Sequence, residues 1–109
     1  MTDADAGDGI DHVRRVVSNA TVIGEKEFAN MSVVLPAAWL HDCVIVAKNS
    51  PMRSRASFMA AEAAFEFLSK IEYPQELISQ IRHCIHAHSF SAKVNCETTE
   101  AKVVQDADR

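Results

Sequence analysis

Apolar residues recur at helical spacing along most of this 109-residue chain, and this periodicity limits the possible folds more than any other sequence feature. In the first apolar segment they occupy the i, i+3, i+4, i+7 positions of one helix face: Val13, Val16, Val17, Ala20 and Ile23. No segment shows the alternation of apolar and polar residues that is typical of a half-buried strand. The sequence therefore predicts an all-α protein, a bundle of about five helices.

Turn residues and capping residues predict where these helices begin and end. The first helix is expected to begin after Asp11 and to end at Gly24. The other four are expected over residues 34–47, 55–70, 74–88 and 100–109, the last one capped by Thr98 or Thr99. Pro36 is tolerable only near the first turn of its helix, because a proline has no N–H to donate.

The first nine residues differ in composition from the rest of the chain. Residues 1–9 are small and acidic and include two glycines, so we expect a flexible N-terminal tail. Residues 10–109 are then expected to form one helical domain, because a chain of this length hardly accommodates a second.

Three features of the sequence indicate which partners and which cellular compartment to expect for this protein: its net charge, its apolar runs and its cysteines. Eleven Lys and Arg residues stand against fifteen Asp and Glu residues, whereas a binder of duplex nucleic acid carries a basic excess. The longest apolar run, residues 33–40, is far shorter than the roughly 20 residues that span a bilayer. The cysteines are odd in number and form no CxxC pair, so we expect a reducing, cytoplasmic environment.

Two strongly polar residues, His41 and Asp42, follow directly on this apolar run, in a segment that is expected to be largely buried. Burying an unpaired polar group costs roughly 1–3 kcal/mol, so each side chain needs a partner. An imidazole with a carboxylate forms a mixed nitrogen and oxygen ligand set, which suits Mn, Fe, Ni, Zn or Mg. The simpler interpretation is a pair that is hydrogen-bonded to the backbone at a helix end.

Three motifs in order resemble the HD-domain phosphohydrolase superfamily, which is named for this doublet. They are DHVRRV at residues 11–16, AAWLHD at residues 37–42 and ADR at residues 107–109. Intervening segments, among them AKN at 47–49 and AHSFS at 87–91, resemble a subgroup of small bacterial HD hydrolases. The resemblance covers roughly residues 11–109 and implies an all-α HD-domain bundle.

The resemblance implies that His12, His41, Asp42 and a later aspartate hold one or two divalent metal ions. Asp106 and Asp108 are the candidates for that aspartate. On a helix they diverge by about 200°, so they cannot both face one metal. The register of the family's Ala-Asp-Arg motif favours Asp108.

The resemblance also implies a phosphate-binding role for residues near these motifs. His88 matches the Ala-His-Ser of the family, which places it beside the phosphate or the metal-bound water, although a structural histidine at a helix end is the alternative. Lys48, Arg53 and Arg55 follow the doublet, and cations there could clamp phosphate oxygens. The alternative is that these three cationic side chains simply lie on the solvent-exposed surface. Asp42, His88 and Lys48 are the expected catalytic residues.

The function that this resemblance implies is metal-dependent hydrolysis of a phosphorylated small molecule, with a nucleotide as the expected substrate. The alternative is a catalytically silent, shortened HD-fold module that binds a partner. Stoichiometric metal with turnover favours the enzyme, and bound metal without turnover favours the module.

Members of the family continue with further helices beyond the last motif, so the chain is expected to be an N-terminal part of an HD domain. A second copy could then cover the apolar face that such helices would occupy. We therefore predict a homodimer, which size-exclusion chromatography with light scattering tests. A monomer at every concentration measured would contradict it.

Overall fold

The computed structural model describes residues 3–44, 51, 55–89 and 94–108, and these residues form helices and connecting turns without a strand. The prediction of an all-α fold is confirmed. The five helices in the described ranges are α1 (Asp3–Lys26), α2 (Met31–Leu40), α3 (Ala56–Lys70), α4 (Gln75–Ala87) and α5 (Thr99–Asp108). In these ranges no helix is both long and apolar enough to cross a membrane.

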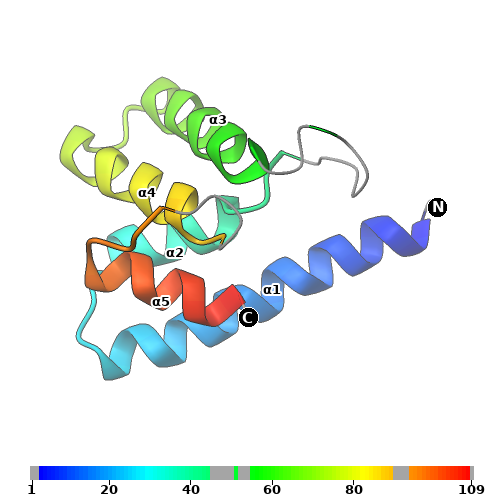
Figure 1. The fold of residues 1–109 in the computed structure, drawn as a ribbon, viewed down its shortest axis with the longest axis horizontal. Helices are drawn as coiled ribbons and strands as arrows, with labels where there is room; N and C mark the ends of the chain where they lie inside the picture. The colour runs from blue at the N-terminus through cyan, green and yellow to red at the C-terminus, as the bar shows by residue number, and fades with distance from the viewer. Residues whose placement is uncertain (1–2, 45–50, 52–54, 90–93, 109) are drawn as a thin grey trace.

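Helix α2 lies at the centre of the bundle, where it packs against each of the other helices. Figure 1 shows α1 and α5 lying along one side of it, and the pair formed by α3 and α4 on the other. α2 carries no charged residue, and four of its residues are almost completely buried: Val33, Val34, Ala37 and Ala38. A helix that is apolar all round belongs in a core, so α2 organises the bundle.

The core around α2 is built from branched and small side chains. Ile78, Ile81 and Ile85 of α4 are its largest members, and Val103 and Val104 of α5 complete it from the other side. Alanines fill the positions where α3 approaches its neighbours, namely Ala60, Ala61 and Ala64. These small residues allow α3 to approach its neighbours closely.

The predicted end of the second helix is wrong. Residues 34–47 were expected to be helical, but α2 ends at Leu40, and residues 41–44 form a turn. The helix also begins earlier than expected, after Asn30, whose side chain accepts a hydrogen bond from the Ser32 N–H. As a result the His41-Asp42 doublet lies just beyond the helix rather than within it.

Pro36 lies in the second turn of α2, although the sequence predicts that a proline is tolerated only near the first turn. A residue at this position would normally donate its N–H to the carbonyl of Ser32, four residues earlier, and proline cannot. The Tyr73 hydroxyl donates to that carbonyl instead, at 2.9 Å. The turn between α3 and α4 therefore supplies the bond that the proline removes from α2.

Both predicted ends of the first helix also differ from the structure. Asp11 is not its N-cap, because α1 is already helical from Asp3 through the residues expected to form a tail. Alanine at positions 4 and 6 favours a helix, so the small residues there do not oppose it. Gly24 does not end α1, which runs on to Lys26. A Cβ at Gly24 would lie 2.7 Å from the Met31 sulfur, so the glycine serves close packing against α2.

The remaining boundaries agree more closely with the sequence prediction. α3 begins after Arg55, and α4 begins after Pro74. Of the two threonines proposed to cap the last helix, Thr98 is the one whose hydroxyl accepts a hydrogen bond from the Ala101 N–H, at 3.0 Å. The expected loop at residues 48–53 lies outside the described residues except for Pro51, and most of the 89–97 loop is described.

Replacing Tyr73 by Phe should destabilise the protein by about 1 kcal/mol, because the Ser32 carbonyl loses its donor. Urea unfolding of the Tyr73→Phe variant measures this loss. The matched control is the same substitution in a Pro36→Ala background, where the alanine at position 36 can donate the helical bond itself. There the cost of Tyr73→Phe should largely disappear. An equal cost in both backgrounds would contradict this account of the proline.

Candidate metal centre

All five helices described in the structure, or the residues that directly follow them, contribute to the lining of a cavity of about 260 Å³. α1 contributes one residue to its lining, the end of α2 contributes two, and the first turn of α3, the end of α4 and the last residue of α5 contribute the others. The lining is strongly polar and consists of His12, His41, Asp42, Ala56, Ser57, His88, Ser89 and Asp108.

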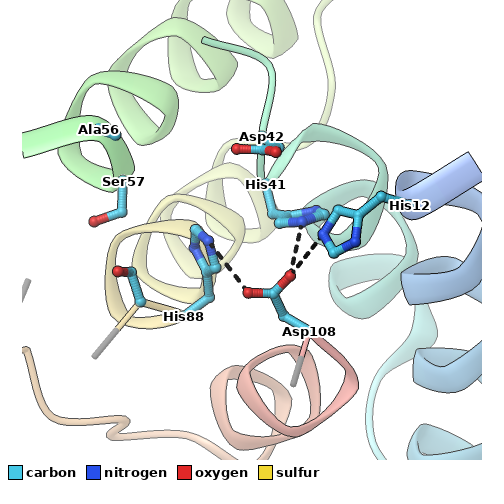
Figure 2. Close-up of a pocket in the computed structure, with 8 residues that line it drawn as sticks. His12, His41, Asp42, Ala56, Ser57, His88 and Asp108 are labelled. Carbon is cyan, nitrogen blue, oxygen red and sulfur yellow. Dashed lines mark hydrogen bonds and ion pairs between the residues drawn. The ribbon is translucent and has the colours of Figure 1, made fainter. Parts of the chain in front are cut away.

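The carboxylate of Asp108 is the point on which three imidazoles converge (Figure 2). Its Oδ1 lies 3.0 Å from His12 Nε2 and 3.3 Å from His41 Nε2. Its Oδ2 lies 3.9 Å from His88 Nε2. Asp108 is the last residue of α5, so the end of that helix is what carries the carboxylate into the cavity.

Two of these rings are oriented by the backbone of the helix that carries them. His41 Nδ1 lies 2.6 Å from the carbonyl oxygen of Ala38, and His88 Nδ1 lies 2.5 Å from that of Ile85. A carbonyl only accepts, so Nδ1 must carry the proton in both rings. When these imidazoles are neutral, Nε2 of each ring carries no proton and has a free lone pair. The Nε2 atoms of both His41 and His88 face Asp108.

His41 Nε2 is left without a hydrogen-bond partner although the residue is only 1% exposed. The Asp108 oxygen at 3.3 Å is within ion-pair distance, but it too is an acceptor when the imidazole is neutral. Two neutral lone pairs and a carboxylate that face one another require a cation or an added proton between them. A proton on His41 would complete the arrangement within the protein, and a bound metal ion would satisfy the same atoms.

The ionisation states follow from burial and from these contacts. Burial and the proximity of His41 lower the pKa of His88, so that ring tends to stay neutral. Burial opposes ionisation of Asp108, but the neighbouring imidazoles outweigh it and lower the pKa of its carboxyl group. Burial also disfavours the charged form of His41, yet Asp108 and the Ala38 carbonyl raise its pKa overall. The pKa shifts thus favour an ionised Asp108 and a neutral His88, which are the ligand states that a metal needs, whereas without a metal they favour a proton on His41.

His12 differs from the other two histidines in its tautomer. An Arg15 N–H donates to His12 Nδ1 at 3.3 Å, because a guanidinium can only donate. The proton of a neutral His12 ring is then on Nε2, which donates to Asp108. Arg15 lies one helical turn after His12, and this i, i+3 spacing is the sequence signal that could have identified it.

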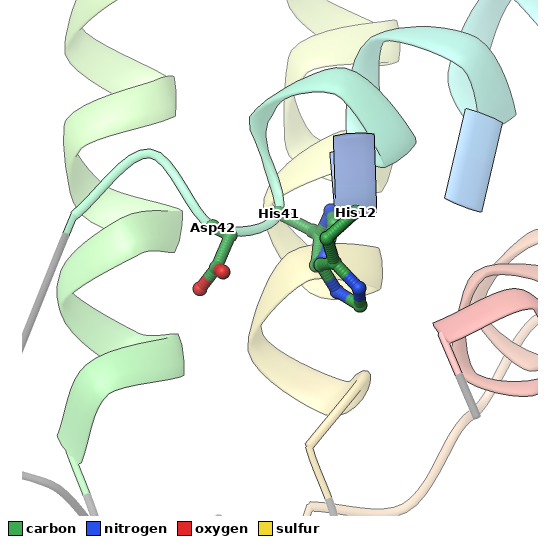
Figure 3. A group of neighbouring side chains, drawn as sticks. All are labelled: His12, His41 and Asp42. Atoms are coloured by element: carbon green, nitrogen blue, oxygen red, sulfur yellow. The ribbon is translucent and has the colours of Figure 1, made fainter. Parts of the chain in front are cut away.

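Asp42 is exposed, in contrast to the expectation that the whole doublet is buried. The reason is the early end of α2, which places Asp42 in the turn that follows the helix. Figure 3 shows its carboxylate on the same side as the rings of His41 and His12. These three residues can each present a ligand atom within 4.8 Å of one another, and so can His41, His88 and Asp108.

The donor set suits a divalent cation of borderline or hard character. It consists of imidazole nitrogens and carboxylate oxygens, and no cysteine lines the cavity. Such a mixed set is compatible with Mn, Fe, Ni or Zn and, with more oxygen ligands, with Mg. The two overlapping groups that share His41 provide ligands for one ion or for two neighbouring ions.

The other residues proposed from the sequence have different positions. Lys48 and Arg53 lie outside the described residues. Arg55 is exposed at the N-cap of α3, and its guanidinium lies 5.6 Å from the centre of the Phe58 ring rather than in the cavity lining. Of the two candidate aspartates near the C-terminus, Asp106 is exposed and outside the lining, whereas Asp108 is inside it.

Ser57 and Ser89 line the cavity without having been proposed as site residues from the sequence. Ser89 follows His88 in the Ala-His-Ser segment that resembles the family, and this position is the signal that could have identified it. Ser57 becomes distinctive only in three dimensions, because the first turn of α3 borders the cavity (Figure 2).

Comparison with known proteins identifies the fold. The HD domain family model matches residues 9–109. The chain belongs to the HD-domain family. An uncharacterised Bacillus subtilis (strain 168) protein, YpgQ, is 34% identical to the HD domain described here over 113 aligned positions that include all of this chain. The chain spans about half of YpgQ, 53% of its length.

Membership connects the cavity with a known chemistry. HD domains form a superfamily of metal-dependent hydrolases that bind divalent ions and act on phosphorylated small molecules. The histidines and aspartates of the two candidate metal-binding groups all lie within the residues that the family model matches.

Manganese should stabilise the HD domain through this cluster. With Mn²⁺ 100-fold above its Kd, we expect the free energy of unfolding to rise by about 2.7 kcal/mol. The Asp108→Asn variant should lose most of this gain, since the amide removes the charge on which the three imidazoles converge. Thermal unfolding with and without Mn²⁺ measures the effect. The control is Asp106→Asn, which changes an exposed carboxylate outside the cavity and should leave the gain intact. An equal loss in both variants would contradict the site.

Proposed function

We propose that this protein is a metal-dependent phosphohydrolase that acts on a phosphorylated small molecule, with a nucleotide as the expected substrate. His12, His41, Asp42 and Asp108 would hold the divalent metal. A bound metal of this kind supplies an activated water and polarises a phosphoryl oxygen. Family membership supports the reaction class, and the choice of a nucleotide rests on analogy with the family.

The observation that carries this proposal is the convergence of ligand atoms that need a cation or an added proton between them. His41 Nε2 is buried, unpartnered and 3.3 Å from a carboxylate oxygen. Leaving a buried polar atom unpaired costs about 1–3 kcal/mol, and a purely structural pair would be arranged to avoid that cost. The backbone bond to Ala38 accounts for His41 Nδ1 alone, and a metal ligand set accounts for Nε2 and the Asp108 carboxylate together.

Several residues of the protein would have different roles around the phosphate of the substrate. Burial lowers the pKa of His88, which favours its neutral form, and the ring is 8% exposed and held through Nδ1, so Nε2 would be the atom that accepts a proton at the cavity wall. Asp42 is more accessible than the histidines and lies where solvent and substrate can both reach it. Lys48, Arg53 and Arg55 are proposed to neutralise charge on the phosphate.

The second candidate function is a catalytically silent HD module that binds metal or a partner without turnover. Turnover, rather than metal binding, separates the two functions.

The test is release of phosphate from a panel of nucleoside mono- and triphosphates and sugar phosphates in the presence of Mn²⁺. We expect metal-dependent release from at least one class, and a reduction of about 100-fold or more in Asp42→Asn. Asp42 is exposed, so this variant should keep its fold, and its thermal unfolding without metal checks that. Asp106→Asn again serves as the control with unchanged turnover. Metal uptake without any release would favour the silent module.

A further inference from the structure

The first turn of α3 forms the part of the cavity wall that contains no metal-ligand candidate. Ala56 and Ser57, the first two residues of this helix, both line the cavity. Figure 2 shows them at the end of α3, on the opposite side of the cavity from Asp108. A 15-residue helix thus directs its N-terminus at the site where the metal ligands converge.

This helix terminus lacks the features that usually neutralise it. Its first turn contains no acidic residue, and the N-cap residue, Arg55, makes no capping hydrogen bond with its side chain. The first N–H groups of a helix have no partner within the helix, and together with the helix dipole they favour an anion. The positive charge of Arg55 adds to this preference rather than cancelling it.

Ser57 provides a second and independent indication of a ligand. The residue is only 5% exposed, and its hydroxyl oxygen is buried without a hydrogen-bond partner. A buried hydroxyl that lines a polar cavity and finds no protein partner is costly unless a ligand completes it. A change of the Ser57 side-chain rotamer would let the hydroxyl donate to an oxygen placed in the cavity.

We infer that the N-terminus of α3, with the hydroxyl of Ser57 and the backbone N–H groups of its first turn, is the subsite that binds the phosphate group of the substrate. This inference rests on the proposed function. It adds a phosphate-binding surface on the side of the cavity opposite the metal-ligand candidates. The phosphate would lie between α3 and the cluster around Asp108. Because Asp42 and Asp108 are both carboxylates that line the same cavity, the anion binds more tightly once a divalent cation balances their charge.

The chain contains a close control for Ser57. Ser69 lies near the other end of α3, and its hydroxyl is likewise buried and without a partner, but it does not line the cavity. Ser57→Ala and Ser69→Ala therefore remove the same kind of group from the same helix. Both substitutions should leave the melting temperature of the metal-free protein unchanged or slightly higher, because each removes an unsatisfied buried hydroxyl.

The experiment is calorimetric titration of inorganic phosphate into the full chain, in the Mn²⁺-loaded and the metal-free state. Wild type should bind phosphate, and more tightly with Mn²⁺. Ser57→Ala should weaken the binding by about tenfold, while Ser69→Ala leaves it unchanged. Titration with Mn²⁺ alone should give the same Kd for all three proteins, since neither serine is a metal ligand.

Each other outcome has a defined meaning. Equal phosphate affinity in wild type and Ser57→Ala, or Mn²⁺ uptake without any phosphate binding, would overturn the subsite and leave the metal centre in place. Failure of wild type to bind Mn²⁺ would instead contradict the proposed function. In that case, metal-free phosphate binding that only Ser57→Ala weakens would still support the subsite, and no phosphate binding would overturn it.

Discussion

The hydrogen bonds from His41 Nδ1 to Ala38 and from His88 Nδ1 to Ile85 determine what the centre of this molecule can do. Each ring donates to a carbonyl near the end of its own helix, where carbonyls lack partners within the helix. The bond fixes the tautomer and turns Nε2 toward Asp108. A carbonyl at a helix end and a candidate metal ligand thus share one proton, and the backbone provides the kind of contact that orients a ligating histidine.

The position of His41 depends in turn on the burial of α2. This helix has no charged residue and packs against all the others, so its C-terminal end is held in the interior. His41 follows at that end and is buried with it, while the turn that begins there brings Asp42 to the surface. The same helix tolerates Pro36 because Tyr73, from the turn between α3 and α4, donates to the carbonyl that the proline leaves free.

The cavity has two walls of different chemistry. One wall contains imidazoles and carboxylates, which suit a cation, and the other is the N-terminus of α3 with an unpartnered hydroxyl, which suits an anion. A phosphorylated molecule together with a divalent metal would satisfy both walls at once. This complementarity connects the family chemistry of HD domains with residues of α3 that lie between the sequence motifs.

The sequence by itself determined the helical class, most of the helices, and the ligand candidates His12, His41 and Asp42, because apolar periodicity and motif order are local properties of the chain. It did not determine the end of α2 or the start of α1, where packing and tertiary hydrogen bonds outweigh local preference. The register of the Ala-Asp-Arg motif already favoured Asp108 over Asp106, but only the tertiary structure placed the half-buried Asp108 in the cavity lining, and only it brought Ser57 to the cavity. Both depend on how helices distant in the chain meet, and neighbouring residues do not encode that geometry.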